Sequence, residues 1–355
     1  MSALLRHPNS WGGARAACRW WKPRGQGSSE GGDGLPAGGP VGKGWPYRGR
    51  MLRRPVLVLL LGVVALVPAG ALATDRSTIK LVGAPGAIAV GAGGVWVLVG
   101  DASGERLILL DATTGVTRAT VRLGAEGSES GGVAVGASGV WAAAGARVFR
   151  IDPHRHKIVA IVPVGAEATS MLATRAAVWV TRATGKFGQL IRIDPTTNDV
   201  ASRTSLGGGP SAVVAAFGSI WITNTSPSSL MRIDPRTSTV LATLLPGRFS
   251  SSLAVAQNRL WVAGEQTLVG LDARGRIVRR VKLGRTVVHI AAAGTVLWGT
   301  DDCACATGRL VQVDLRRSHV VKTVAVGQTP VALAVADRSV WVADFGDASI
   351  SRVPY

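Results

Sequence analysis

Two thiols and two carboxylates stand together in the segment Asp301-Asp302-Cys303-Ala304-Cys305, the most unusual group of reactive side chains in the sequence. Two cysteines one residue apart can form a tight local disulfide, remain free thiols or contribute to a metal site. Tetrahedral zinc needs further ligands, and no second pair of cysteines or histidines accompanies these two. The only other cysteine is Cys18, so there is no disulfide framework, and the three alternatives for Cys303 and Cys305 stay open.

Histidines are equally sparse. His154 and His156 flank a single arginine and could bind a metal together, although a solvated basic turn is the simpler interpretation. His289 stands alone near the start of an apolar run that ends in Ala293. No P-loop, dinucleotide-binding or zincin motif occurs. We therefore predict no catalytic residue, and His289 is a candidate only because of the strand on which it lies.

The elements that position these residues are indicated by tryptophans that recur at intervals of 45, 38, 42, 40, 37 and 43 residues: Trp96, Trp141, Trp179, Trp221, Trp261, Trp298 and Trp341. A period of about 40 residues is typical of the four-stranded blades of a β-propeller. The count of seven gives the number of blades. We predict an all-β, seven-bladed β-propeller over residues 74–355.

One repeat shows the pattern of a blade most clearly. Between Gly207 and Leu245, four short β-rich runs are separated by turns rich in Gly, Pro, Ser and Asn. The last repeat stops after its third strand, Ile350–Val353, whereas Thr78–Val82 precedes the first complete blade. We expect this N-terminal strand to supply the missing outer strand, because an open ring would leave strand edges exposed.

Two recurrent residue types are expected to be structural. The tryptophan of each second strand is predicted to lie in the core between neighbouring blades. Six aspartates end the third strands, and three of them precede a proline, which is good type I turn chemistry. They are Asp111, Asp152, Asp194, Asp234, Asp272 and Asp314.

Charge separates between the two faces of the predicted ring. The upper face carries the loops that join outer to inner strands and second to third strands, and the lower face carries the other two kinds of loop. The upper loops hold acidic candidates for a ligand site or for Ca²⁺ or Mg²⁺, with His289 near the channel: Asp101, Glu105, Asp301, Asp302, Asp344 and Asp347. The lower loops hold basic candidates for binding a partner or an anionic surface: Arg155, Lys157, Arg236, Arg274, Arg276, Arg316 and Arg317. The alternative is that both faces are ordinary solvated surfaces and that the separation of acidic from basic residues has no function.

The N-terminal part is not propeller-like. Met51-Leu-Arg-Arg precedes an uncharged apolar run, Pro55–Val67, and small residues follow at Ala71 and Ala73. This pattern predicts a signal peptide over residues 51–73 that is cleaved after Ala73, or else an uncleaved membrane anchor. Both alternatives place the propeller outside the cytoplasm, extracellular or at the cell surface. Residues 1–50 are rich in Gly, Pro and Arg and are interpreted as a mis-annotated extension, with a disordered tract as the alternative.

The repeat resembles that of secreted YVTN-type β-propellers and, more distantly, that of virginiamycin B (streptogramin) lyases. The similarity lies in the run Val326-Gly-Gln-Thr-Pro-Val-Ala-Leu-Ala-Val335 followed by Val340-Trp-Val-Ala343, and in related runs after Leu81 and Leu206. The lyase resemblance implies histidines and a glutamate around a magnesium ion at the central channel. Only His289 is placed suitably, so the implied catalytic set does not carry over.

The sequence thus favours an exported, non-catalytic, bacterial binding scaffold that is a monomer without a cofactor. Its partner would be a protein, a cell-wall component or a small molecule; few aromatic side chains lie outside the core, so no sequence-specific nucleic acid is expected. The alternative is a cation-dependent lyase- or hydrolase-like enzyme whose site lies at the upper mouth of the channel.

Overall fold

The computed structural model describes residues 76–124, 131–184, 187–245, 249–301, 307–336 and 338–355. The predictions made for residues 1–73, and for Asp302, Cys303 and Cys305, fall outside these ranges. The described ranges contain no helix that is long and apolar enough to cross a membrane.

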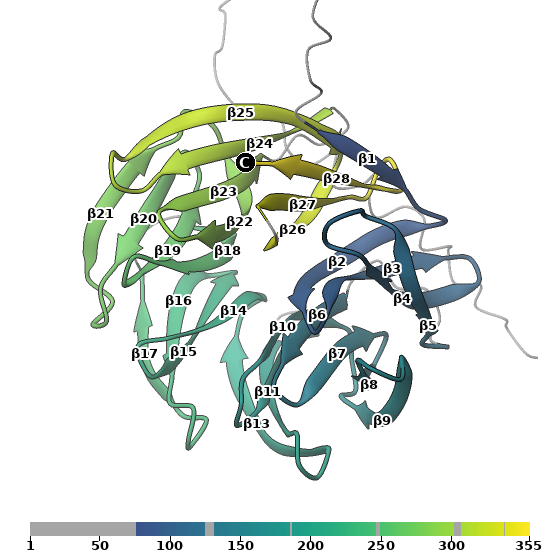
Figure 1. The fold of residues 1–355 in the computed structure, drawn as a ribbon. Helices are drawn as coiled ribbons and strands as arrows, with labels where there is room; N and C mark the ends of the chain where they lie inside the picture. Colours follow the sequence, from purple (N-terminus) through teal and green to yellow (C-terminus); the bar gives the residue numbers. More distant parts are fainter. Residues whose placement is uncertain (1–75, 125–130, 185–186, 246–248, 302–306, 337) are drawn as a thin grey trace, which may run out of the picture. The chain divides into compact units, whose positions relative to one another are not determined.

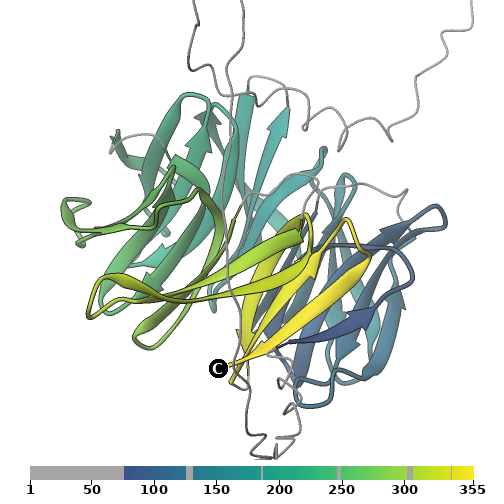
Figure 2. The same ribbon diagram turned by 90° about the horizontal axis from the view of Figure 1, so that it is seen from above.

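Seven antiparallel four-stranded sheets are arranged in a ring (Figure 1). The prediction of a seven-bladed β-propeller is therefore confirmed. Within a blade the strands run from the inner strand at the channel through a second and a third to the outer strand. The strands run between the two faces of the ring, and the C-terminus lies at the lower one (Figure 2).

Blades 1 to 3 are formed by consecutive strands. Blade 1 comprises β2 (Ala84–Gly91), β3 (Gly94–Asp101), β4 (Gly104–Leu110) and β5 (Thr117–Arg122). Blade 2 comprises β6 (Gly131–Gly136), β7 (Gly139–Ala144), β8 (Arg147–Asp152) and β9 (Lys157–Pro163). Blade 3 comprises β10 (Ala168–Ala173), β11 (Val178–Thr184), β12 (Phe187–Asp194) and β13 (Asp199–Gly207).

Blades 4 to 6 repeat this order. Blade 4 comprises β14 (Pro210–Ala216), β15 (Ser219–Thr225), β16 (Ser228–Ile233) and β17 (Val240–Leu244). Blade 5 comprises β18 (Phe249–Ala256), β19 (Arg259–Gly264), β20 (Thr267–Leu271) and β21 (Ile277–Lys282). Blade 6 comprises β22 (Val287–Ala293), β23 (Val296–Asp301), β24 (Thr307–Asp314) and β25 (His319–Gln328).

Blade 7 joins the two ends of the propeller. It comprises β26 (Pro330–Ala336), β27 (Ser339–Asp344), β28 (Ser349–Pro354) and β1 (Ser77–Lys80), which is its outer strand. The register pairs Ser77 with Arg352 and Lys80 with Ser349. Beyond the strand, the Leu81 amide donates to the Ala348 carbonyl at 2.9 Å. The predicted closure is confirmed, although the strand starts one residue and ends two residues earlier than the expected Thr78–Val82.

The seven tryptophans are at most 1% exposed, so the prediction that they are core residues is also confirmed. Each lies opposite an inner-strand residue, and five of these seven residues are alanine: Ala89, Ala134, Ala254, Ala291 and Ala334. The small partner leaves room for the indole. Each cluster spans two neighbouring blades; Trp341, for example, packs with Val95 and Val97 of blade 1 across the point of closure. Apolar packing between blades therefore runs across the seam where the ring closes.

The six turn aspartates build a common lower-face turn. Their Oδ1 atoms accept hydrogen bonds from backbone amides two to four residues later, at 2.6–3.4 Å. In five blades the aspartate carbonyl also accepts from the amide four residues on, which in blades 2 and 6 belongs to His156 and Ser318, both in the left-handed region. Backbone amides, foremost that of Arg155, hold the pKa of Asp152 below its usual range. The prediction of a structural role is confirmed.

Arginines of the third strand form a second repeat that the sequence analysis missed. Arg150, Arg192, Arg232 and Arg352 stack on the tryptophans of their own blades, at 5.3–5.9 Å from the ring centroids. Arg150 also donates to the Pro195 carbonyl at 2.8 Å, in the lower turn of the next blade. Arg352 reaches across the closure to the Thr113 carbonyl of blade 1. Arg150 and Arg352 therefore fasten their blades to the next one.

A buried carboxyl lies at the upper end of the seam between blades 6 and 7. Asp344 is fully buried, its Oδ2 accepts a hydrogen bond from Ser351 Oγ at 2.5 Å, and its Oδ1 has no partner in the described part of the chain. Burial raises the pKa of Asp344 to about 6. In blade 4 the same register position is occupied by Asn224, opposite Ser229 as Asp344 is opposite Ser349. An amide therefore fits this position.

A propeller that starts at Val82, and so lacks β1, is expected to be less stable than one that starts at Thr74 by about 2–4 kcal/mol, because the burial of Ile79 and Leu81 is lost. The bare edge of β28 should also cause concentration-dependent association. Urea unfolding and size-exclusion chromatography test both effects. Superimposable unfolding curves would contradict the closure.

Asp344→Asn is expected to stabilise the protein by about 1–3 kcal/mol at about pH 7. The folded-state pKa, about 6, lies above the ordinary 3.8, so the contribution of Asp344 to stability is lost as the pH rises through this window. The gain should therefore vanish near pH 4. Asn224→Asp is the matched control and should destabilise at neutral pH. Urea unfolding followed by tryptophan fluorescence measures both, and a gain independent of pH would refute the explanation.

Candidate functional site

A cavity of about 550 Å³ opens at the upper mouth of the central channel. It is lined by the first residues of inner strands from all seven blades. The lining includes the small residues Gly86, Ala87, Gly131, Gly132, Gly209, Ala212 and Ala332, the hydroxyl-bearing residues Thr169, Ser170, Ser211, Thr225 and Ser252, and His289. The small residues follow from crowding, since a Cβ added to Gly132 would lie 2.8 Å from the Met171 side chain.

The hydroxyl groups are held in place by the second strands or by a neighbouring blade. Thr169 Oγ1 lies 2.9 Å from Thr181 Oγ1, and Ser211 Oγ lies 3.0 Å from Thr223 Oγ1. Ser252 Oγ accepts a hydrogen bond from the Ile290 amide at 2.9 Å, which leaves its proton free to donate. None of the described residues that line the cavity is an Asp, Glu, Lys or Arg. This described lining can therefore form hydrogen bonds and contributes no full charge.

Among the described residues of this lining, His289 is the one with a titratable side chain. A register shift in β22 brings it opposite Thr300 of β23. Part of the imidazole surface stays open to the channel, yet the channel walls surround it, and this desolvation lowers its pKa to about 4. His289 therefore lies at the mouth of the channel, where it is a neutral hydrogen-bond donor and acceptor at physiological pH.

The described acidic candidates, Asp101, Glu105, Asp301, Asp344 and Asp347, lie on blades 6, 7 and 1 and do not belong to the mouth lining. Asp101 is engaged by Ser103 and forms an ion pair with Arg106 at 2.6 Å; hydrogen bonds, first that from the Ser103 hydroxyl, lower its pKa to about 2. Glu105 is buried. Of the two predicted cation ligands on blade 1, Asp101 is therefore already bound to Ser103 and Arg106, and Glu105 is buried within the protein.

The same holds on the two preceding blades. Asp301 accepts from the Arg309 amide at 2.8 Å and pairs with Arg285 at 3.3 Å. Asp347 accepts from the Gln328 amide at 2.8 Å. Among the described residues, no group of three or more His, Cys, Asp or Glu side chains could hold a metal ion. The predicted acidic residues share a face, but in the described ranges they do not converge.

The predicted basic residues are all exposed and lie on the lower turns of blades 2, 4, 5 and 6: Arg155, Lys157, Arg236, Arg274, Arg276, Arg316 and Arg317. The side chains of Arg155 and Arg317 are 80% and 79% exposed, and each is 4.0 Å from the aspartate that anchors its own turn. Arg276 pairs more closely with Asp272, at 2.8 Å. His156 contacts the ring of Trp96, with 6.2 Å between centroids, which favours the structural interpretation of the two histidines.

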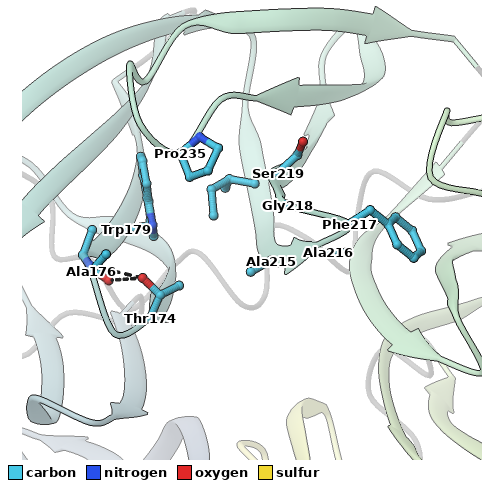
Figure 3. Close-up of a pocket in the computed structure, with 11 residues that line it drawn as sticks. Thr174, Ala176, Trp179, Ala215, Ala216, Phe217, Gly218, Ser219 and Pro235 are labelled. Atoms are coloured by element: carbon cyan, nitrogen blue, oxygen red, sulfur yellow. Dashed lines mark hydrogen bonds between the residues drawn. The ribbon is translucent and has the colours of Figure 1, made fainter.

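Sequence reasoning missed a smaller lower-face cavity of about 300 Å³ between blades 3 and 4 (Figure 3). Trp179, Phe217 and Pro235 line it together with alanines. One sequence signal was available. In blades 4 and 7 a serine, Ser219 or Ser339, stands two residues before the tryptophan, whereas in blade 3 this position is Ala177. Those serines accept from Arg232 and Arg352, whereas the Nε atom of Arg192 has no partner in the described part of the chain.

Comparison with known proteins adds the fold only. No protein-family model matches the sequence, and no curated protein matches it. Among solved structures, the chain is similar to Kuenenia stuttgartiensis hydrazine synthase, with 14% identity, a TM-score of 0.63 and coverage of 78% of this chain and 97% of that one. It is also similar to the Pan2 WD40 domain of Neurospora crassa, with 13% identity, a TM-score of 0.61 and coverage of 77% and 90%. The similarity supports a seven-bladed β-propeller and leaves the YVTN and lyase resemblances as expectations.

Proposed function

We propose that this chain is an exported, non-catalytic β-propeller that binds a ligand or partner. The observation that carries the proposal is the composition of the upper mouth: among the described residues its lining consists of hydroxyl groups, small or apolar side chains and one neutral imidazole, without an acidic or basic side chain. Propellers serve many unrelated functions, and protein binding is a common one. Export rests on the apolar run before Ala73.

The mouth is poorly equipped for catalysis. General acid–base chemistry needs a second group to orient or complement the imidazole, and electrostatic catalysis needs charge where charge develops. His289 has neither in the lining of the mouth. The lyase resemblance would require several histidines and a glutamate around a cation. A neutral imidazole between hydroxyl groups is better suited to hold a ligand than to transform it.

The ligand class follows from the same lining. A charged ligand would lose its hydration without gaining a counter-charge, whereas an uncharged ligand with several hydrogen-bonding groups would find donors and acceptors. A volume of about 550 Å³ lies within the range of small-molecule sites. The proposed ligand at the mouth is therefore a small, uncharged, polar molecule, or an uncharged polar tip of a larger partner.

A fragment screen by ligand-observed NMR tests this site. Uncharged, hydrogen-bonding fragments should bind the wild-type propeller in preference to anionic and cationic ones. Ala332→Trp, which fills the mouth, should abolish that binding, whereas Val278→Trp on the exposed outer strand β21 should not change it. The site is wrong if bound fragments respond equally to both substitutions, or if no fragment class binds.

A titration with Ca²⁺ and Mg²⁺, followed by calorimetry and thermal melting, tests the cation-dependent enzyme as the alternative. We expect no saturable binding, because Asp101, Asp301 and Asp347 are engaged within the protein. Saturable binding that disappears in Asp301→Asn/Asp302→Asn would instead establish an upper-face cation site and favour the enzyme. Asp199→Asn, which changes an exposed lower-face carboxylate, is the matched control.

A further inference from the structure

The lower face presents a set of arginines that the proposed ligand site does not use. We call the lower rim the exposed basic residues Arg155, Lys157, Arg236, Arg274, Arg276, Arg316 and Arg317. All lie in, or directly after, the turns that join third to outer strands, so four blades present them at the same end of the ring. Arg175 and Arg338, in turns between inner and second strands of blades 3 and 7, add exposed charge at this end.

The turns fix the direction of these side chains. In the turns anchored by Asp234 and Asp314, the carboxylate is consumed by backbone amides, including those of Arg236, Arg316 and Arg317. The side chains of Arg236 and Arg316 are not needed for these bonds and are exposed to solvent. Arg155 and Arg317 are also mostly exposed, at 4.0 Å from their turn aspartates, whereas Arg276 pairs with Asp272 at 2.8 Å. Blades 1 and 3 are exceptions, because their turns present exposed threonines, with Asp199 in blade 3, in place of arginine.

The chain also enters the ring from this side. The β1–β28 register places Ser77 nearer the lower end of the blade and Lys80 at the upper end, opposite Ser349. Tyr355 lies at the same end, where its amide donates to the Arg338 carbonyl and its side chain is 44% exposed. Tyrosine is a residue type favoured at membrane interfaces.

We propose that the lower rim docks the propeller on an anionic lipid bilayer, with the upper mouth turned away from the membrane. Each basic residue near an anionic membrane surface contributes to binding, and a polybasic surface combines with a hydrophobic segment to give stable attachment. In the propeller of residues 74–355 the lower rim alone supplies this attraction.

Co-sedimentation of the propeller, residues 74–355, with phosphatidylcholine vesicles, with and without phosphatidylglycerol, tests the docking. These residues form a compact unit whose ring is closed by its own β1. The rim variant is Arg236→Ser/Arg274→Ser/Arg316→Ser/Arg317→Ser, whose turns are held by backbone amides and should fold normally. The matched control, Arg122→Ser/Arg147→Ser/Arg280→Ser/Lys282→Ser, removes the same charge from exposed strand positions away from the lower turns. Circular dichroism and thermal melting confirm that both variants are folded.

We expect binding only to vesicles that contain phosphatidylglycerol, weakened by salt. Removal of each rim arginine should weaken it about fivefold, so the rim variant should lose on the order of a hundredfold or more. The control should lose much less. Equal losses in both variants would show attraction by net charge alone and overturn the proposal. Absence of vesicle binding, or tighter rim-dependent binding to a DNA duplex than to vesicles, would also overturn it.

Discussion

The antiparallel pairing of β1 with β28 is the contact on which the ring depends. Each of the other six blades is formed by four consecutive strands, so its sheet is specified locally, but blade 7 is complete only when residues about 270 positions apart meet. Two further contacts join blade 7 to blade 1: Trp341 packs on apolar side chains of blade 1, and Arg352 donates a hydrogen bond to the Thr113 carbonyl. Because every blade covers one face of its neighbour, the channel mouth keeps its shape only while the seam is closed.

Much of this architecture could be predicted because it repeats. The spacing of Trp96 to Trp341 predicted the blades, and the aspartates before Pro153 and Pro235 predicted the turns, since both signals are local. The contact of Arg150 with the next blade was missed, although an arginine two residues before the aspartate recurs in the sequence. Its partner, Pro195, lies 45 residues away, and only the angle between blades brings the two together.

The candidate site could likewise be predicted only in part. His289 could be placed near the channel from its position at the start of an inner strand, but the hydroxyl groups around it could not, because serine and threonine are common in loops and strand ends alike. The acidic upper residues were expected to be available for a cation or a ligand. The engagement of Asp101 and Asp301 by Arg106, Arg285 and backbone amides could not be predicted, because hydrogen-bond partners depend on side-chain geometry. Assigning residues to loops thus does not indicate which of their side chains are already bound to other groups.

The closure has a mechanical consequence. The chain enters β1 and leaves β28 at the lower end of blade 7, and the two strands are antiparallel neighbours. A force that pulls the residues before Ser77 away from Tyr355 therefore loads the hydrogen bonds between these strands one after another, as a zipper is opened, rather than all together in shear. The first hydrogen bonds to break lie at the lower end of blade 7. Under tension on the N-terminal segment, only one or two hydrogen bonds therefore carry the load at a time. Tension on the N-terminal segment is thus expected to detach this one strand and so to open the ring at blade 7.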